Sequence, residues 1–501
     1  MGNDSLKSPP KTMGGIMCHL GPGLILAGSI VGSGELIATT RTGAEAGFSF
    51  LWLIIAGCVV KVFAQVELAR HCITHSETTV TAMNRLPGPK ITVSVKDRKI
   101  GGHIIVIFWL FTFLVGLGQL GGIVGGVGQA LAISVPLTEE GRAYNVEADE
   151  FLAKQIQTKR SEPTIEETAP ARRQAPPDAL IWSALITLVT AIMLYKGSFN
   201  FIETFCVVMV GSFTFITIGN VVALQTQVDW AISLQDLKHG FAFHFPEGTA
   251  ETSPLITALA AFGIIGIGAS ELVAYPYWCL EKGYGKFVGK RDQSDGWTER
   301  ARGWMRVLQW DAWGSMVIYT ISTVAFYLLG AATLNRMDLI PEKSEMIRTL
   351  SVMYEPVFGR FGQLILLCGA FAVLFSTFFV SNATKSRLMT DALGVLGFTT
   401  LDDSKRLKLI RFFSIFFPLF CLAIYIVYPN PSKLILFSGI LQAIFLPMMG
   451  YAALYFRYKT IDSRLRPNLL WDIFLAISFV CFLIIGVYLT VSKFNQFLPH
   501  S

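Results

Sequence analysis

The chain has 501 residues, of which 52% are hydrophobic and 15% are charged, and its mean hydropathy is +0.52. Soluble proteins carry about a quarter charged residues, so this composition excludes an ordinary soluble domain. The net charge of +6 does not indicate a nucleic-acid partner, because the basic residues lie between long apolar runs, where they act as an orientation signal.

Apolar runs of about 20 residues, long enough to cross a bilayer as helices, recur along most of the chain. We therefore predict an all-α integral membrane protein with about eleven transmembrane helices. The predicted spans are 20–40, 48–69, 103–134, 179–195, 201–224, 255–279, 311–333, 361–384, 410–428, 433–455 and 469–491.

The basic residues predict how these spans are oriented. Lys and Arg are more frequent in the alternating segments that share a side with residues 1–17, which predicts a cytoplasmic N-terminal tail. An odd number of spans then puts the C-terminus outside. The tail has no cleavage pattern, so the first span is expected to be an uncleaved anchor. No organelle signal is visible, which favours a bacterial inner membrane.

The segment 135–178, between the third and fourth spans, is acidic and rich in proline. It is expected to form an external cap that is flexible or partly helical. Such segments bury little apolar surface, so a solvated spacer is the favoured interpretation.

A heptapeptide occurs twice, as Gly-Ser-Gly-Glu-Leu-Ile-Ala over 32–38 and as Gly-Ala-Ser-Glu-Leu-Val-Ala over 268–274. The copies lie in the first and sixth spans, an odd offset of five spans, so their surroundings have opposite orientations. This is the plan of inverted-repeat transporters with broken helices. It predicts one repeat over 18–224, a second over 225–455, and an additional helix and tail over 456–501.

Each heptapeptide combines helix-weakening small residues with one carboxylate. Glycines alone are also explained by close helix packing. A glutamate at membrane depth, however, is costly and indicates function. We therefore predict substrate-binding residues at both breaks, with Glu35 and Glu271 as proton carriers or metal ligands: Gly32, Ser33, Gly34 and Glu35, then Ile267, Gly268, Ser270 and Glu271.

Other charged residues in the spans carry weaker predictions. Lys61 lies mid-way along the second span and is a candidate partner for one of the glutamates. Glu67 and Arg70 are three residues apart and are expected to pair locally. Asp311 begins the predicted seventh span and is expected to be its N-cap.

The extramembrane segments contain no nucleophile–base pair, phosphate loop or metalloprotease motif, so we expect no enzyme and no cofactor. The eight cysteines are dispersed, without a Cys-x-x-Cys, and indicate neither disulfides nor a metal cluster. The expected partners are a transported ion or small solute and the lipid bilayer; a monomer is plausible.

Three motifs in the first two spans resemble the opening of the Nramp (natural resistance-associated macrophage protein) divalent-metal transporters. They are Gly21-Pro22, Gly32-Ser33-Gly34-Glu35 and Gly43-Ala44-x-x-Gly47-Phe48-x-x-Leu51-Trp52. Gln65 with Arg70, the stretch 364–388 and the stretch 438–447 are further points of resemblance. The resemblance implies a LeuT-type fold of five plus five helices and secondary transport.

The sequence departs from this family where its chemistry lies. The family's metal-binding Asp and Asn fall on Gly32 and Glu35, and its Met and Pro on Ser270 and Glu271. Its acidic pair for proton movement falls on Gln119 and Gly122, and its histidine on Leu272.

Three functions fit these features. Two carboxylates with carbonyl and hydroxyl oxygens suit a hard divalent cation such as Mg²⁺, Mn²⁺ or Ca²⁺, which we favour. The alternative substrate is an organic solute, such as an amino acid or amine, transported with or without protons. A sensor or scaffold that binds a partner through 135–178 is disfavoured, because it has no use for two buried glutamates.

Overall fold

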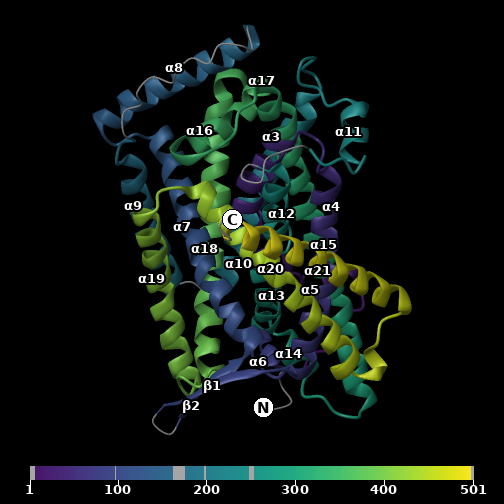
Figure 1. The fold of residues 1–501 in the computed structure, drawn as a ribbon. Coiled ribbons are helices and arrows are strands. Elements are labelled where there is room, and N and C mark those ends of the chain that lie inside the picture. The colour runs from purple at the N-terminus through teal and green to yellow at the C-terminus, as the bar shows by residue number, and fades with distance from the viewer. Residues whose placement is uncertain (1–5, 96–97, 162–174, 197–198, 247–252, 498–501) are drawn as a thin grey trace.

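The computed structural model describes residues 6–95, 98–161, 175–196, 199–246 and 253–497, and within them the fold is helical apart from one hairpin (Figure 1). Ten helical segments in this part of the chain are long and apolar enough to cross a membrane. The predicted all-α membrane fold is therefore confirmed. The predicted fifth span, 201–224, corresponds to α10, Phe199–Leu224. This helix is not one of the ten segments, so the expected total of eleven stays a prediction.

In its described residues, the first half of the chain forms ten α-helices and a π-helical turn, η2. Pro22 begins the first long helix, where its fixed φ and missing N–H are tolerated. The elements are α1 (Met13–Met17), α2 (Pro22–Ile30), η2 (Ser33–Thr39), α3 (Thr40–Ala46), α4 (Leu51–Val59), α5 (Lys61–His75), α6 (Thr79–Asn84), α7 (Ile104–Ser134), α8 (Glu139–Ser161), α9 (Asp178–Lys196) and α10.

The second half of the described chain contains the longest helices, α15 and α18. Its α-helices are α11 (Leu234–Gly240), α12 (Pro254–Ile264), α13 (Ala269–Lys282), α14 (Tyr284–Val288), α15 (Asp295–Leu329), α16 (Met346–Ser351), α17 (Glu355–Phe358), α18 (Gly362–Val395), α19 (Asp403–Val427), α20 (Pro431–Tyr455) and α21 (Leu469–Phe497). Short π and 3₁₀ turns are η3 (Gly330–Leu334), η4 (Asn335–Met337), η5 (Lys343–Glu345), η6 (Val352–Tyr354), η7 (Gly359–Phe361), η8 (Phe456–Thr460) and η9 (Ser463–Leu465).

A β-hairpin was not predicted. Strands β1 (Lys90–Val95) and β2 (Arg98–His103) pair antiparallel, with Lys90 opposite His103 and Val95 opposite Arg98. The amide of Gly101 donates to the Leu396 carbonyl at 2.9 Å, which joins the hairpin to the end of α18. The hairpin lies at the end of the molecule that also holds the N-terminus (Figure 1).

The acidic segment 135–178 is helical over 139–161, which was one of the two forms expected for it. There it forms α8, which lies across the end of the bundle opposite the hairpin (Figure 1). Arg348 of α16, only 2% exposed, binds Asp149 and donates to the Asn145 side chain at 2.6 Å. One charge of α8, that of Asp149, therefore pairs with a buried arginine. Residues 162–174 of the segment lie outside the described residues.

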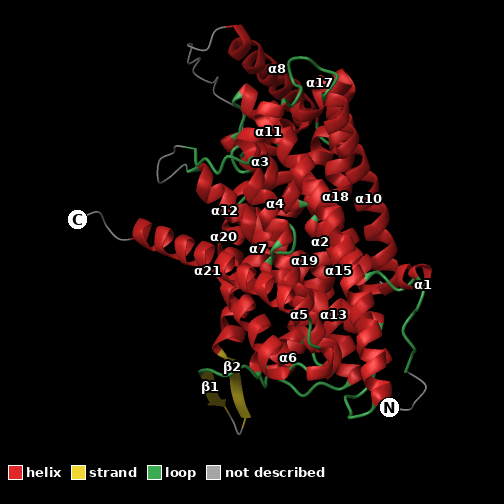
Figure 2. Cartoon of the chain, turned by 90° about the vertical axis from the view of Figure 1, so that its right-hand side faces the viewer, coloured by secondary structure: helices red, strands yellow, loops and turns green. Residues whose placement is uncertain are grey.

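Helix packing depends on glycine where backbones meet. A Cβ on Gly263 of α12 would lie 2.0 Å from the Gly439 carbonyl of α20, and one on Gly439 would lie 2.4 Å from the Ala260 carbonyl. The close-packing interpretation of the glycines therefore holds at these positions. The last helix, α21, is inclined steeply to the other long helices (Figure 2).

The seventh span begins earlier than predicted, because α15 starts at Asp295. Its first turns carry charged residues outside the apolar run, which the hydropathy pattern does not register. Asp311 is consequently not an N-cap of its own helix. It instead accepts hydrogen bonds from the amides of Gly21 at 2.9 Å and Gly23 at 2.7 Å, and thus caps α2 from another helix.

Candidate functional site

The first helix breaks at Val31 and Gly32. Val31 has ψ 86° and ends α2, and η2 begins at Ser33. Thr377 of α18 donates from its hydroxyl toward the carbonyls of Gly28 at 3.2 Å and Val31 at 3.4 Å. A Cβ on Gly32 would lie 1.9 Å from this hydroxyl oxygen. Gly32 therefore makes room for the group that satisfies the interrupted helix end.

The sixth helix breaks between Ile264 and Ala269. Gly266 has φ +53°, a conformation that glycine adopts without strain. The two breaks face each other: a Cβ on Gly34 would lie 3.1 Å from the Ile264 carbonyl oxygen. The structure thus places the first heptapeptide against the break that precedes the second one. The role of their residues as substrate ligands stays a prediction.

Glu35 joins the two breaks and is fully buried. Its Oε1 accepts hydrogen bonds from the Gly266 amide at 3.3 Å and the Thr323 hydroxyl at 3.1 Å. Its Oε2 accepts from the Gly32 amide at 3.4 Å. Interrupted helices leave such amides unpaired, and here the carboxylate acts as an internal anion for both of them.

Lys61 supplies the opposite charge and is also fully buried. Its ammonium donates to the Phe262 carbonyl and, at 2.8 Å, to the Ile265 carbonyl, and it lies 4.4 Å from the centre of the Phe262 ring. These carbonyls end α12, where the helix dipole favours a cation. Lys61 therefore occupies with its own side chain a position that would otherwise attract a cation.

Glu271 differs from Glu35 in exposure. It lies in the first turn of α13 and, like Ser270, is only partly buried. Its Oε2 would lie 2.5 Å from a Cβ on Gly268, so the carboxylate comes close to the backbone at this glycine. The cations that attract its carboxylate are Lys385 and Lys61. Lys385 is 7% exposed and directs its ammonium toward the Phe113 carbonyl at 3.4 Å.

A chain of amide and hydroxyl groups links the two breaks through α7 and α20. The Gln119 amide donates to the Ser33 hydroxyl at 3.1 Å, and its carbonyl accepts from Ser438 and from Gln442, each at 2.9 Å. Gln442 in turn accepts from the Ser270 amide at 3.1 Å. The prediction of the site did not include Gln442. The sequence feature that could have indicated Gln442 is a side-chain amide in an otherwise apolar span.

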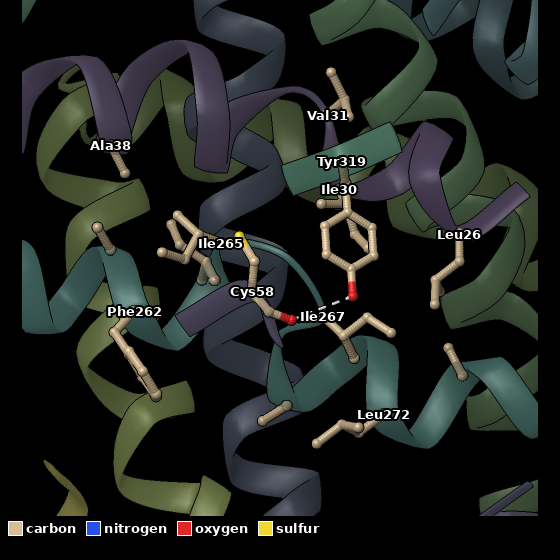
Figure 3. Close-up of a cluster of buried hydrophobic side chains, with 14 of the residues drawn as sticks. Leu26, Ile30, Val31, Ala38, Cys58, Phe262, Ile265, Ile267, Leu272 and Tyr319 are labelled. Carbon is tan, nitrogen blue, oxygen red and sulfur yellow. Dashed lines mark hydrogen bonds between the residues drawn. The ribbon is translucent and has the colours of Figure 1, made fainter. Parts of the chain in front are cut away.

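Apolar side chains surround the breaks on their other side. Figure 3 shows Leu26, Ile30 and Val31 of the first helix facing Ile265, Ile267 and Leu272 of the sixth. Tyr319 lies between them, with its hydroxyl 3.5 Å from the Cys58 carbonyl. Ile267 contributes to this fully buried packing. The breaks are therefore closed by apolar packing on this side, whereas Glu271 and Gln119 are partly exposed.

Asp311 fixes the start of the first helix against two others. Besides the two amides of the α2 turn, it accepts a hydrogen bond from the Tyr275 hydroxyl of α13 at 2.8 Å. It is 2% exposed and lies on α15. This carboxylate therefore connects α2, α13 and α15 near the site.

Comparison with known proteins decides the family. The model of the family described as natural resistance-associated macrophage protein-like matches residues 174–492, more than half of the chain. The chain belongs to the Nramp family. A search of curated protein sequences finds no significant match to this Nramp chain.

Solved structures share the fold of this Nramp protein. A mutant of the manganese transporter from Eremococcus coleocola is 14% identical and superposes with a TM-score of 0.64, covering 99% of this chain and 91% of that one. MhsT in complex with L-phenylalanine is 15% identical, with a TM-score of 0.52 and coverages of 97% and 99%. The nucleobase-cation-symport transporter Mhp1 is 14% identical, with a TM-score of 0.52 and coverages of 96% and 91%. The predicted inverted-repeat, LeuT-type fold is thereby confirmed.

The charges at the breaks are unusual for a site that holds a divalent cation. The described residues contain no group of three His, Cys, Asp or Glu side chains that could hold a metal ion. Two carboxylates, Glu35 and Glu271, are matched by two lysines, Lys61 and Lys385. The four side chains therefore carry no net charge when all are ionised.

Proposed function

We propose that this Nramp-family chain is a secondary transporter of a small organic solute without net charge, amino-acid-like or otherwise polar. The observation that carries the proposal is that two buried lysines lie close enough to the breaks to offset the charges of Glu35 and Glu271: Lys61 donates to the Ile265 carbonyl beside Gly266, and Lys385 acts on the carboxylate of Glu271. A divalent cation that enters this site meets two resident ammonium groups, whereas a zwitterionic or polar solute adds no unbalanced charge.

The groups that bind the solute are, in this proposal, the partly exposed ones. Gln119, Ser270 and Glu271 lie on the open side of the breaks, and Ser33 and Gln442 hold them through the amide chain. Glu271 receives an ammonium group of the solute or a co-transported proton. Glu35, in contrast, keeps the two breaks together. The proton-carrying role that the sequence assigned to both glutamates is thus proposed for Glu271 alone.

A hard divalent cation remains the second candidate. The family match and the fold shared with a manganese transporter favour it. In that case Glu271 with the Ser270 and Ser33 hydroxyls are the oxygen ligands, and Lys385 must move aside. For either substrate we propose a cytoplasmic N-terminus, a bacterial inner membrane location and a monomer.

Uptake into proteoliposomes distinguishes the candidates. The panel contains radiolabelled amino acids and polar solutes together with Mn²⁺ and Mg²⁺, with and without a proton gradient. We expect saturable uptake of one organic solute, loss of at least about tenfold in Glu271→Gln, and unchanged uptake in the control Glu299→Gln, whose side chain is exposed on α15. Saturable Mn²⁺ or Mg²⁺ uptake without any organic uptake would establish the cation instead.

A further inference from the structure

A basic pocket lies apart from the helix breaks, where α9 and α19 pack side by side. It has a volume of about 420 Å³. It opens beside the last residues of α9 and the first turns of α19, at the end of the bundle that holds the N-terminus and the hairpin (Figure 1). Its lining includes Lys196, Arg387, Arg406 and Arg411.

The positive charges of this pocket exceed the negative ones. Arg387 is held by Glu281 through two hydrogen bonds of 2.7 and 3.0 Å, and Arg406 by Asp391 at 2.9 Å. Lys196 and Arg411 are exposed, and Arg411 lies 5.7 Å from the centre of the Tyr195 ring. The two paired arginines form a fixed wall, and Lys196 and Arg411 add two cations at the mouth.

The depth of the pocket matches the surface of a bilayer. Lys196 is the last residue of the apolar span Asp178–Lys196, and α19 becomes apolar soon after Arg411. Basic pockets between helices at this level suit the head groups of anionic lipids. A soluble anion would be attracted by the same charges, but its binding would not require a pocket at the level of the bilayer surface.

Exposed apolar side chains continue from the pocket along both helices. Leu188 and Ile192 of α9 are 55% and 53% exposed, and Phe412 and Phe416 of α19 are 55% and 42% exposed. Such side chains suit contact with acyl chains. The charged pocket at the end of the span and the apolar surface along it are therefore both features that a phospholipid would contact.

We propose that this pocket binds the phosphate of an anionic glycerophospholipid from the leaflet on the N-terminal side. The phosphate lies between Lys196 and Arg411, with Arg387 and Arg406 behind it, and the acyl chains follow the α9–α19 surface. This site is independent of the transported substrate.

Binding of short-chain lipids to the purified, delipidated full chain tests the proposal. Phosphatidylglycerol is expected to bind at least about tenfold more tightly than phosphatidylcholine, which has no net charge. The double variant Lys196→Gln/Arg411→Gln should weaken phosphatidylglycerol binding about 30-fold, because each basic residue near an anionic surface contributes about fivefold. The charge-keeping variant Lys196→Arg/Arg411→Lys should bind like the native protein.

The matched control is Lys405→Gln/Lys408→Gln, which removes two exposed charges from the same helix outside the pocket. It should leave phosphatidylglycerol binding within about twofold. Equal losses in the control and pocket variants, or unchanged binding in the pocket variant, would overturn the proposal. Displacement of the lipid by inorganic phosphate at comparable concentration would assign the pocket to a free anion and overturn the lipid assignment.

Discussion

At the scale of single residues, the two helix breaks are stabilised by side chains of the chain itself. Glu35 accepts from amides at both breaks, and Lys61 donates to the carbonyls that end α12. Buried groups of this kind are costly to leave without partners. The pair therefore explains how two interrupted helices persist in an apolar interior.

Replacing Lys61 with methionine tests this explanation. Lys61→Met leaves two carbonyls without a donor and Glu35 without a nearby cation, so stability should fall by about 3–5 kcal/mol. Adding Na⁺ should recover part of the loss in the thermal unfolding midpoint, with choline as the inactive comparison. A midpoint equal to that of the native protein would contradict the assigned role.

Asp311 gives a second prediction at this scale. Asp311→Asn keeps one acceptor but removes the charge that three donors share, and should destabilise the protein by about 1.5–3 kcal/mol. Tyr275→Phe, which removes one of the donors, should cost about 1 kcal/mol. Thermal unfolding in detergent ranks the two variants. The reverse order would show that Asp311 does not organise these contacts.

At the scale of elements, glycine sets how closely α12 approaches α20. Gly263→Ala places a methyl group 2.0 Å from the Gly439 carbonyl oxygen, so it should destabilise the pair by about 1–3 kcal/mol or more through overpacking. Gly314→Ala is the matched control, because no atom lies within 4 Å of its added carbon. It should be neutral or raise stability by up to about 1 kcal/mol through helix propensity.

Helix α8 is attached to the bundle by a buried arginine, Arg348, together with hydrogen bonds such as that from the Asn145 amide to the Ala132 carbonyl at 3.0 Å. Arg348→Met removes its contacts with Asp149 and Asn145, so α8 should detach and be cleaved faster by an added protease. Arg142→Gln removes an exposed pair within α8, between Arg142 and Glu139 at 3.0 Å, and should leave the cleavage rate unchanged. Equal rates in both variants would show that Arg348 does not hold the helix.

At the scale of the whole molecule, two connecting segments distant in the sequence are joined on the N-terminal side. Arg464 donates to the carbonyls of Asp292 at 3.1 Å and Gln293 at 3.2 Å. Asp462 pairs with Arg464 at 3.0 Å and with Arg291 at 3.1 Å. The segment before α15 is thereby attached to the segment between α20 and α21.

This connection should depend on pH. The Arg464 hydrogen bond, together with the Arg464 and Arg291 charges, holds the pKa of Asp462 below its ordinary value of 3.8. A carboxyl whose pKa is lowered by folding stabilises the protein above its unfolded pKa, and the contribution is lost as the pH falls below about 4. Native protein should therefore be more stable than Asp462→Asn at neutral pH, with the difference in unfolding midpoint shrinking on acidification. A difference independent of pH would contradict the assignment.

The local pattern of the sequence predicted much of this architecture. The bounds of α7, α9 and α20 agree with prediction within two residues, and Glu67 pairs with Arg70 at 3.2 Å as expected. Both breaks were located from the sequence because glycine weakens a helix and a carboxylate at membrane depth is costly. These are properties of neighbouring residues, which periodicity and composition record.

Contacts between distant residues were beyond such patterns. The bond of Glu35 to the Gly266 amide, the position of Lys61 at the end of α12 and the pairing of Arg348 with α8 all depend on how the helices are arranged. The prediction of a divalent-cation substrate was based on the two carboxylates at the breaks. It did not include Lys385, because this residue follows the end of the predicted span 361–384, whereas in the structure it lies within α18 and its charge acts on Glu271.

The hydrogen bonds of Asp311 have a consequence for motion. They connect the first turn of α2 with α13 and α15, and each connection is buried. A rotation that opens the site toward the N-terminal side would therefore move the three helices together as one rigid body. The bending would fall on Val31, Gly32 and Gly266, so the two breaks would act as hinges in addition to the binding role proposed for them.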